Sequence, residues 1–152
     1  MGQLALEQEL ARHTIIGLDT APFIYLWEKH PRYFSFSAGL FRYLDSRQVE
    51  GVTSIITLIE ACVYPQRQGR ADLVRAYEQA LLHSRQVRML PIDVKLAQRA
   101  VILRARHSIR VPDALQIAAA MESGATLFVT NDHQLKRVSE INVLLFDEYV
   151  EG

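Results

Sequence analysis

The sequence is poor in the residues from which several common functional sites are built. Cys62 is its single cysteine, so no internal disulfide can form, which is typical of a protein from a reducing cytoplasm. We expect Cys62 to be a small buried packing residue rather than a nucleophile. The five histidines have no spacing typical of a zinc site. The sequence also lacks a glycine-rich phosphate loop and a convincing Ser/His/Asp arrangement.

Long apolar runs are missing as well. Runs such as residues 143–146 are far shorter than the ~20 residues that a membrane-spanning helix needs. Residues 1–14 carry charges and lack the continuous apolar stretch of a secretory signal. We therefore expect no membrane association and a cytoplasmic location. With 152 residues, 49% of them hydrophobic, the chain suits one domain over residues 1–152.

The charge is balanced in total but uneven in type. The formal net charge is zero, and 14 of the 17 basic residues are arginines, whose planar guanidinium suits bidentate phosphate contacts. Residues 99–110 contain several of these arginines and no acid. We expect Arg104, Arg106 and Arg110 to grip phosphate groups. The alternative is a solvated helix end whose cations favour the helix dipole.

Short apolar runs alternate with segments of helical periodicity. The runs predict strands at residues 15–18, 51–54, 87–90, 126–129 and 143–146. The intervening segments predict helices after Thr20 and at residues 34–44, 55–63, 73–81, 94–106 and 112–124. Because the strands are apolar without alternation, we expect a parallel sheet covered by helices on both faces, a three-layer α/β/α sandwich.

Local signals refine the ends and faces of these helices. Thr20 is expected to cap the first helix, and Ser54 the helix that Pro65 ends. The aromatic side chains at residues 23–27 could stack on bases, but packing is the expected role of most of them. Asp93 is a plausible N-cap for the helix at residues 94–106. Its inner face is expected to contain Ala97, Ala100, Val101 and Leu103.

Four carboxylates from distant parts of the chain are predicted to converge. Asp19 directly follows a predicted strand, and Asp132 follows another after Thr130 and Asn131. Ligands of open α/β sheets bind at the carboxyl ends of the strands. Glu60 and Asp113 lie near the starts of helices and can point to the same edge. Clustered carboxylates repel one another, and a hard dication such as Mg²⁺ or Mn²⁺ relieves that repulsion. Such a metal activates water and polarises a phosphoryl group, so no protein nucleophile is needed.

Each acid also has an ordinary structural explanation. Asp19 could be a strand-end cap, Asp113 a charge favourable to a helix N-terminus, and Asp132 a turn residue. Glu60 could be solvated, or could close a capping box with Thr57. Asp19 and Glu60 nevertheless sit among apolar neighbours, where an acid is rarely buried without a partner.

Each of the four acids lies in a distinct motif: LDTAPFI at residues 18–24, SIITLIE at 54–60, PDALQIAAA at 112–120 and GATLFVTND at 124–132. These motifs resemble those of PIN-domain proteins, close to the VapC-type toxins of toxin–antitoxin pairs. The resemblance spans residues 15–146, and the last two motifs together are fairly specific.

The resemblance implies a five-stranded parallel sheet sandwiched by helices, with Mg²⁺ or Mn²⁺ bound by the four acids. It places three supporting residues near the site: Thr20, Thr130 and Asn131. It also implies homodimers and RNA degradation, with an antitoxin protein as a possible partner. We expect apolar and aromatic residues of the first helices, or of the N-terminal arm, in the dimer interface.

Two departures from the family pattern bear on these expectations. Many relatives have a further aspartate followed by phenylalanine where this chain has Gln134 and Leu135. Residues 1–14 form an N-terminal extension, whose leucines (Leu4, Leu6 and Leu10) are expected to pack on the fold or on a partner.

The sequence therefore predicts a metal-dependent endoribonuclease, toxin-like, whose arginines hold RNA. The alternative is a catalytically weak PIN scaffold that binds RNA or a partner protein. The intact set of four acids favours the enzyme, and the absence of an acid at position 134 keeps the scaffold open. A phosphotransferase that uses Asp19 as nucleophile ranks lower, because no second aspartate follows two residues later.

Overall fold

The computed structural model describes residues 2–46 and 49–150 and contains one five-stranded sheet. All of the strand pairs are parallel, in the order β3-β2-β1-β4-β5. The strands are β1 (Ile15–Leu18), β2 (Glu50–Ser54), β3 (Val87–Leu90), β4 (Leu127–Thr130) and β5 (Asn142–Leu145). This confirms the predicted parallel sheet.

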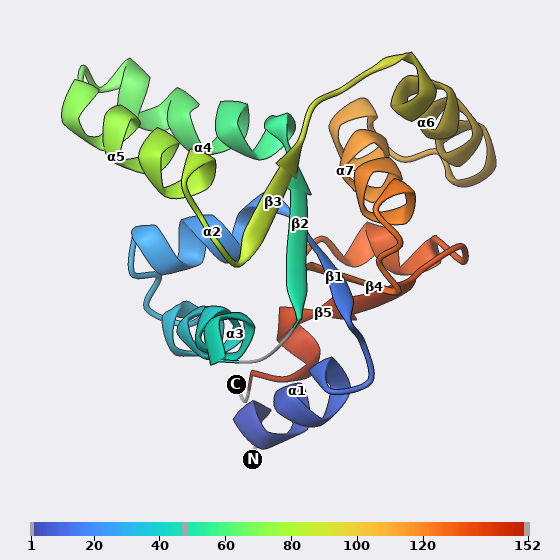
Figure 1. The fold of residues 1–152 in the computed structure, drawn as a ribbon, viewed down its shortest axis with the longest axis horizontal. Helices are drawn as coiled ribbons and strands as arrows, with labels where there is room; N and C mark the ends of the chain where they lie inside the picture. Colours follow the sequence, from blue (N-terminus) through green and yellow to red (C-terminus); the bar gives the residue numbers. More distant parts are fainter. Residues whose placement is uncertain (1, 47–48, 151–152) are drawn as a thin grey trace.

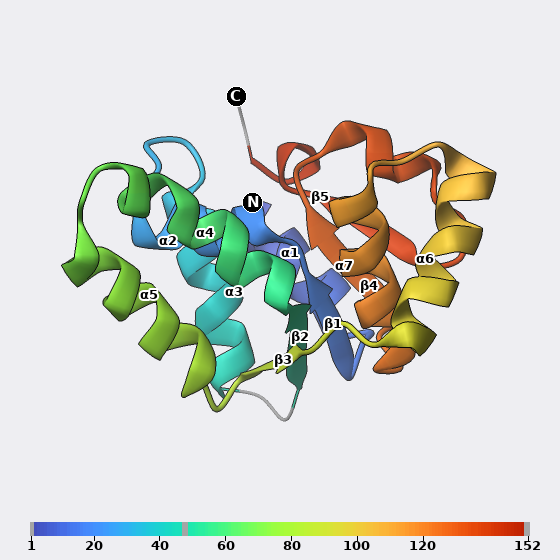
Figure 2. The ribbon, with the colours of Figure 1, turned by 90° about the horizontal axis from the view of Figure 1, so that it is seen from above.

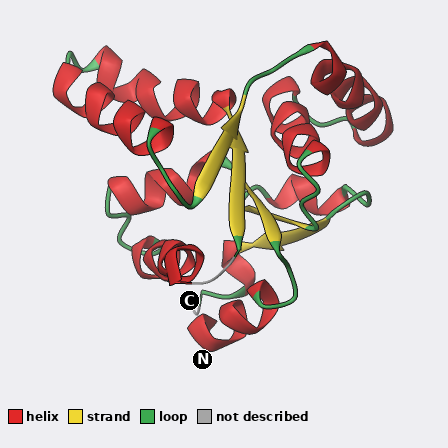
Figure 3. Ribbon diagram, in the orientation of Figure 1, coloured by secondary structure: helices red, strands yellow, loops and turns green. Residues whose placement is uncertain are grey.

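Helices cover both faces of this sheet, as Figures 1 and 2 show. The α-helices are α1 (Gly2–Leu10), α2 (Thr20–Trp27), α3 (Phe34–Ser46), α4 (Ile55–Arg67), α5 (Ala71–Leu82), α6 (Val94–His107) and α7 (Val111–Glu122). Two 3-10 helices, η1 (His133–Arg137) and η2 (Phe146–Glu148), flank β5. Helices α6 and α7 lie together on one side of the twisted sheet, and α2 to α5 lie on the other (Figures 1 and 3). The expected three-layer sandwich is therefore confirmed.

Each strand contributes to two cores because successive side chains of a strand point to opposite faces. In β4, Leu127 and Val129 are buried with helices α1 to α3, whereas Phe128 is buried against α6 and α7. In β5, Leu144 belongs to the first core and Leu145 to the second. Strands buried on both faces explain why the sequence shows apolar runs rather than alternation.

Helix α7 packs unusually close to β1. A Cβ added to Gly17 would lie 2.5 Å from the Cβ of Ala120 and 3.1 Å from the Phe128 ring. The missing Cβ of Gly17 therefore lets the helix approach the strand, and the small alanine side chains of α7 allow the same close distance. This close contact fixes the last turn of α7 against β1.

The N-terminal extension is part of the fold. Leu6 and Leu10 of α1 are fully buried in the core that contains α3, whereas Leu4 is 61% exposed. The expectation of packing on the fold is thus confirmed for two of the three leucines. Met1 lies outside the described residues.

Several local predictions were wrong. Asp19, not Thr20, is the N-cap of α2, because its carboxylate accepts the backbone N–H of Thr20 at 2.8 Å. Ser54 caps α4 as expected, but Pro65 does not end that helix, which continues to Arg67. The ring of Pro65 is buried, and the final turn is held by backbone bonds such as that from Gln68 to the Tyr64 carbonyl, at 3.1 Å.

The inner face of α6 also differs from the prediction. Asp93 caps the helix as expected, and Leu96, Ala100 and Leu103 are buried. Ala97 and Val101 are exposed instead, because the helix is rotated so that a different row of side chains meets α7.

Cys62 is only half-buried, with its sulfur 4.0 Å from the Val74 carbonyl oxygen. The expectation of a buried packing residue is therefore met only in part. Over the described residues, no helix is long and apolar enough to cross a membrane.

Candidate active site: an acidic cleft at the ends of β1 and β4

The four predicted acids line one cleft at the carboxyl ends of β1 and β4. The cleft has a volume of about 350 Å³. It is lined by Asp19, Thr20, Ala21, Ile24, Tyr25, Glu60, Arg110, Asp113, Thr130, Asn131 and Asp132. All three predicted supporting residues are thus at the cleft, together with one of the three predicted arginines. Segments that are more than 110 residues apart in the sequence meet here because parallel strands end at one edge.

Asp19 lies at the floor of the cleft. Its Oδ1 accepts the backbone N–H of Thr20, and its Oδ2 accepts the hydroxyl of Thr130 at 2.7 Å. The side chain is buried, and this burial raises the pKa of its carboxyl group from 3.8 to about 6. The two hydrogen bonds oppose the rise, and the neighbouring charges of Asp113 and Glu60 add to it. Asp19 therefore both caps α2 and concentrates negative potential in the cleft.

Thr130 connects Asp19 with Asp132. Its hydroxyl donates to Asp19 and accepts the backbone N–H of Asp132 at 3.1 Å. Asp132 is also the N-cap of η1, since its Oδ1 accepts the backbone N–H of Gln134 at 3.0 Å. Asp132 is thus a turn residue, as the ordinary structural explanation expects, and its side chain also lines the cleft. Leu135 is buried in the core, and Gln134 is exposed.

Asp113, in the first turn of α7, is paired with Arg110. The guanidinium Nε donates to Asp113 Oδ2 at 3.1 Å. Burial raises the pKa of the Asp113 carboxyl group and Asp132 adds to the rise, while the hydrogen bond and charge of Arg110 oppose it. The hydrogen bond from Arg110 to Asp113 raises the pKa of the guanidinium, and the charges of Asp132 and Glu60 add to this effect. Arg110 is therefore the cation that partly neutralises this cleft.

Glu60 reaches the cleft from the second turn of α4. Its Oε1 accepts the hydroxyl of Thr20 at 2.7 Å. The helix is capped by Ser54, and the hydroxyl of Thr57 accepts from Gln116 rather than joining Glu60. The capping-box explanation for Glu60 is therefore wrong.

The oxygen chemistry of the cleft fits a hard divalent cation. Four carboxylates and the hydroxyls of Thr20 and Thr130 face it, and burial with mutual repulsion disfavours ionisation of Asp19 until a cation is present. Among residues 2–46 and 49–150, no three acidic, histidine or cysteine side chains are close enough to share one ion directly. Mg²⁺ commonly keeps several waters and uses only one or two carboxylates. The residues that would hold it are Asp19, Glu60, Asp113 and Asp132, in part through water.

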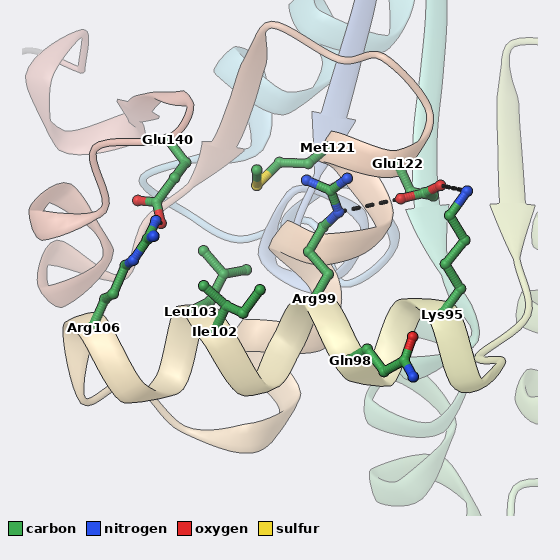
Figure 4. Close-up of a pocket in the computed structure, with 9 residues that line it drawn as sticks. All are labelled: Lys95, Gln98, Arg99, Ile102, Leu103, Arg106, Met121, Glu122 and Glu140. Carbon is green, nitrogen blue, oxygen red and sulfur yellow. Dashed lines mark hydrogen bonds and ion pairs between the residues drawn. The ribbon is translucent and has the colours of Figure 1, made fainter.

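Of the three arginines expected to grip phosphate groups, Arg104 and Arg106 do not line this cleft, whereas Arg110 does. Arg104 Nε donates to the backbone carbonyl of Ile109 at 2.9 Å. Arg106 pairs with Glu140 at 3.3 Å in a separate pocket, which is lined by α6, the last turn of α7 and Glu140 (Figure 4). The reason is the chain reversal at Ser108, whose φ of 54° ends α6 and redirects the chain before Arg110.

Sequence reasoning missed part of the cleft's surroundings. Packing is the expected role of most aromatic residues of α2, without a statement of which one differs; Tyr25 lines the cleft, and its hydroxyl accepts from Asn131 Nδ2 at 3.1 Å. Phe23 is indeed buried in the core, and Trp27 stacks on Tyr77 with ring centroids 4.6 Å apart. The neighbouring sequence does not indicate which way each of these aromatic side chains points. Only the tertiary structure shows which of them lines the cleft and which are packed.

Comparison with known families agrees with this geometry. The family model described as "PIN domain" matches residues 16–141. The chain belongs to the PIN-domain family. The matched region contains every strand residue of β1 to β4 apart from Ile15, and all four acids of the cleft.

Solved structures share the fold of this PIN domain. VapBC2 from Rickettsia felis, bound to a promoter DNA fragment, aligns with a TM-score of 0.67 at 19% identity, over 86% of this chain and 98% of that one. VapC20 from Mycobacterium tuberculosis, described as a toxin that cleaves the sarcin–ricin loop, gives a TM-score of 0.63 at 20% identity, over 84% and 98%. A toxin–antitoxin complex from Klebsiella pneumoniae gives 0.65 at 19% identity, over 87% and 97%. No curated protein sequence matched the chain.

Proposed function

We propose that this PIN domain is an endoribonuclease that hydrolyses RNA phosphodiester bonds with Mg²⁺ or Mn²⁺, and that it acts as a toxin. The observation that carries the proposal is the convergence of Asp19, Glu60, Asp113 and Asp132 on one cleft. The sarcin–ricin loop cleavage named for the mycobacterial relative supports RNA as the substrate class.

The protein residues have distinct tasks in this proposal. A divalent metal would supply an activated water and charge stabilisation on the phosphate. Asp19 is fixed by two hydrogen bonds, so it offers a preorganised negative site at the cleft floor. Arg110, at the cleft edge, provides a cation for an RNA phosphate next to the acids, and its guanidinium geometry suits that contact.

Removing a single carboxylate tests this function. Asp19→Asn should nearly abolish cleavage of single-stranded and structured RNA in Mg²⁺ or Mn²⁺, while the circular dichroism spectrum stays native. Asp93→Asn is the matched control, because Asp93 caps α6 away from the cleft and asparagine is also a good cap. Cleavage by Asp19→Asn protein at the rate of the unaltered protein would contradict the proposal.

The rival function is a scaffold that binds RNA or a partner protein without efficient catalysis. Two observations favour it: Gln134 stands where many relatives have an acid, and Arg110 already pairs with Asp113. The same assays separate the two functions. RNA binding without cleavage in either metal, by protein that is shown to be folded, would decide for the scaffold.

An antitoxin protein is the partner that we propose. Its support is that several solved relatives with this fold are toxin–antitoxin complexes. Expression of the chain should arrest bacterial growth, and co-expression of a small protein encoded next to it should restore growth. Asp19→Asn protein should be harmless in the same cells. Equal toxicity of both proteins would show that growth arrest does not depend on the cleft.

A further inference from the structure

Gln116 lies beneath the acidic cleft without lining it. It follows Asp113 by about one turn of α7, is only 2% exposed, and faces α2, β2 and α4. A buried amide must satisfy its donors and acceptors within the protein. Its hydrogen bonds therefore reveal what it orients.

The orientation of this amide is dictated by Ser54. Gln116 Oε1 accepts the Ser54 hydroxyl at 2.6 Å and the Ser54 backbone N–H at 3.3 Å. A flipped amide would place its NH₂ group against that backbone N–H, two donors facing each other. The Nε2 group must then point to Thr20, at 3.2 Å, and to Thr57, at 2.8 Å.

The two threonine hydroxyls consequently have defined donor directions. Thr53 gives its hydrogen to the Leu18 carbonyl at 2.8 Å, so in the 2.7 Å contact between Thr53 and Thr57 it is Thr57 that donates. Thr20 accepts from Gln116 and donates its single hydrogen to Glu60 Oε1 at 2.7 Å, which is closer and more negative than the Thr57 hydroxyl at 3.3 Å. A directed chain of hydrogen bonds thus runs from Ser54 through the amide to the Glu60 carboxylate.

We infer that Gln116 is a positioning residue that, through the Thr20 hydroxyl, holds the Glu60 carboxylate in the cleft. The inference rests on the proposed metal-dependent function. Glu60 is exposed, and the only hydrogen bond that the described residues give its carboxylate comes from Thr20. Without Gln116, the Thr20 hydroxyl loses the donor that directs it, and Glu60 is free to leave the cleft for solvent. Loss of such a supporting group typically costs about 10- to 100-fold in metal affinity.

A double-mutant cycle on metal affinity tests this role. Binding of Mn²⁺ alone to the full chain is measured by isothermal titration calorimetry for the unaltered protein, Gln116→Met, Glu60→Gln and the double variant. We expect Gln116→Met to weaken Mn²⁺ binding about tenfold in the presence of Glu60. In the Glu60→Gln background it should cause no further loss, because its effect passes through that carboxylate. Equal losses in both backgrounds would overturn the inference and indicate a merely structural role.

Three further variants separate loss of the hydrogen-bond chain from loss of folding. Thr20→Val breaks the same chain of hydrogen bonds with an isosteric side chain and should reproduce the effect of Gln116→Met, whereas Thr20→Ser should retain unaltered affinity. Ile117→Val, on the same helix but buried in the core, controls for loss of stability and should leave Mn²⁺ binding unchanged. Unaltered affinity of Thr20→Val would also overturn the inference.

The outcomes distinguish this inference from the proposed function. Unaltered protein that neither binds Mn²⁺ nor cleaves RNA would overturn both. Unaltered protein that does both, with additive effects in the cycle, would leave the nuclease proposal in place and remove only the role of Gln116.

Discussion

Arg110 Nε lies 3.1 Å from Oδ2 of Asp113, so the acidic cleft contains a cation supplied by its own chain. The arginine side chain is 70% exposed, which leaves it free to exchange this carboxylate for another anion. The Asp113 side chain is only 9% exposed, so the arginine is the partner that can move. We therefore expect Arg110 to exchange Asp113 for a phosphate group rather than to stabilise the fold.

Arg110→Ala is expected to change RNA and metal binding in opposite directions. Loss of one phosphate contact should weaken RNA binding and lower the salt slope of log K by about 0.7 for a single strand. Loss of the positive charge should strengthen Mn²⁺ binding, because Asp113 no longer has a competing cation. Affinities at two salt concentrations and a Mn²⁺ titration check both effects. Arg106→Ala, whose side chain pairs with Glu140 in another pocket, is the control that should change neither.

The raised pKa of Asp19 predicts how the free energy of unfolding depends on pH when a chelator keeps the protein free of metal. Below about pH 4 the folded and unfolded states both hold the proton. Between pH 3.8 and about pH 6 the unfolded chain releases the Asp19 proton while the folded protein keeps it. The free energy of unfolding therefore falls as pH rises. The full loss above pH 6 is about 3 kcal/mol.

Chemical unfolding from pH 4 to 7 measures this effect as a difference between two proteins. In Asp19→Asn the contribution should disappear, so this variant should be the more stable of the two at pH 7. Asp93→Asn should keep the slope of the unaltered protein. Parallel curves for the unaltered protein and Asp19→Asn would show that burial does not penalise this carboxylate.

The leucines of α1 predict that residues 2–10 stabilise the fold. Leu10→Ala removes a fully buried side chain and should lower the free energy of unfolding by about 2–5 kcal/mol. Leu4→Ala, at an exposed position of the same helix, should change it by less than about 0.5 kcal/mol. Denaturant titration of the two variants and the unaltered protein measures both changes in the free energy of unfolding. A small, equal effect for both would mean that α1 is dispensable for folding.

A symmetric homodimer is also predicted, with apolar residues of the first helices or the N-terminal arm in its interface. Because Leu6 and Leu10 are buried within the chain, Leu4 is the leucine of the arm that remains exposed for such a contact. Light scattering at high micromolar concentration should give twice the mass of the chain. Leu4→Asp should shift the protein towards monomer. A monomeric unaltered protein at that concentration would contradict the prediction.

Much of the fold could be predicted because the relevant signals are local. Runs such as residues 15–18 and 127–130 are apolar along most of their length, which strands require when both faces of a sheet are covered. The boundaries that failed depended on packing. The sequence at Pro65 predicts a helix stop, but the buried ring and the bonds of the last turn allow the helix to continue to Arg67.

The placement of Asp19 and Asp132 at one edge follows from the sequence alone, since residues that directly follow parallel strands must end there. Which side chains of the helices face these two acids is decided by the tertiary structure. Helical periodicity states which residues of α6 share a face but not how the helix is rotated, so it wrongly predicts Val101 inside. The acid-free run of arginines does not show that Arg106 pairs with Glu140 in another pocket. The packing of α6 against α7 decides which row of α6 is buried, and the left-handed turn at Ser108 redirects the chain before Arg110. Both depend on tertiary contacts that the local sequence does not specify.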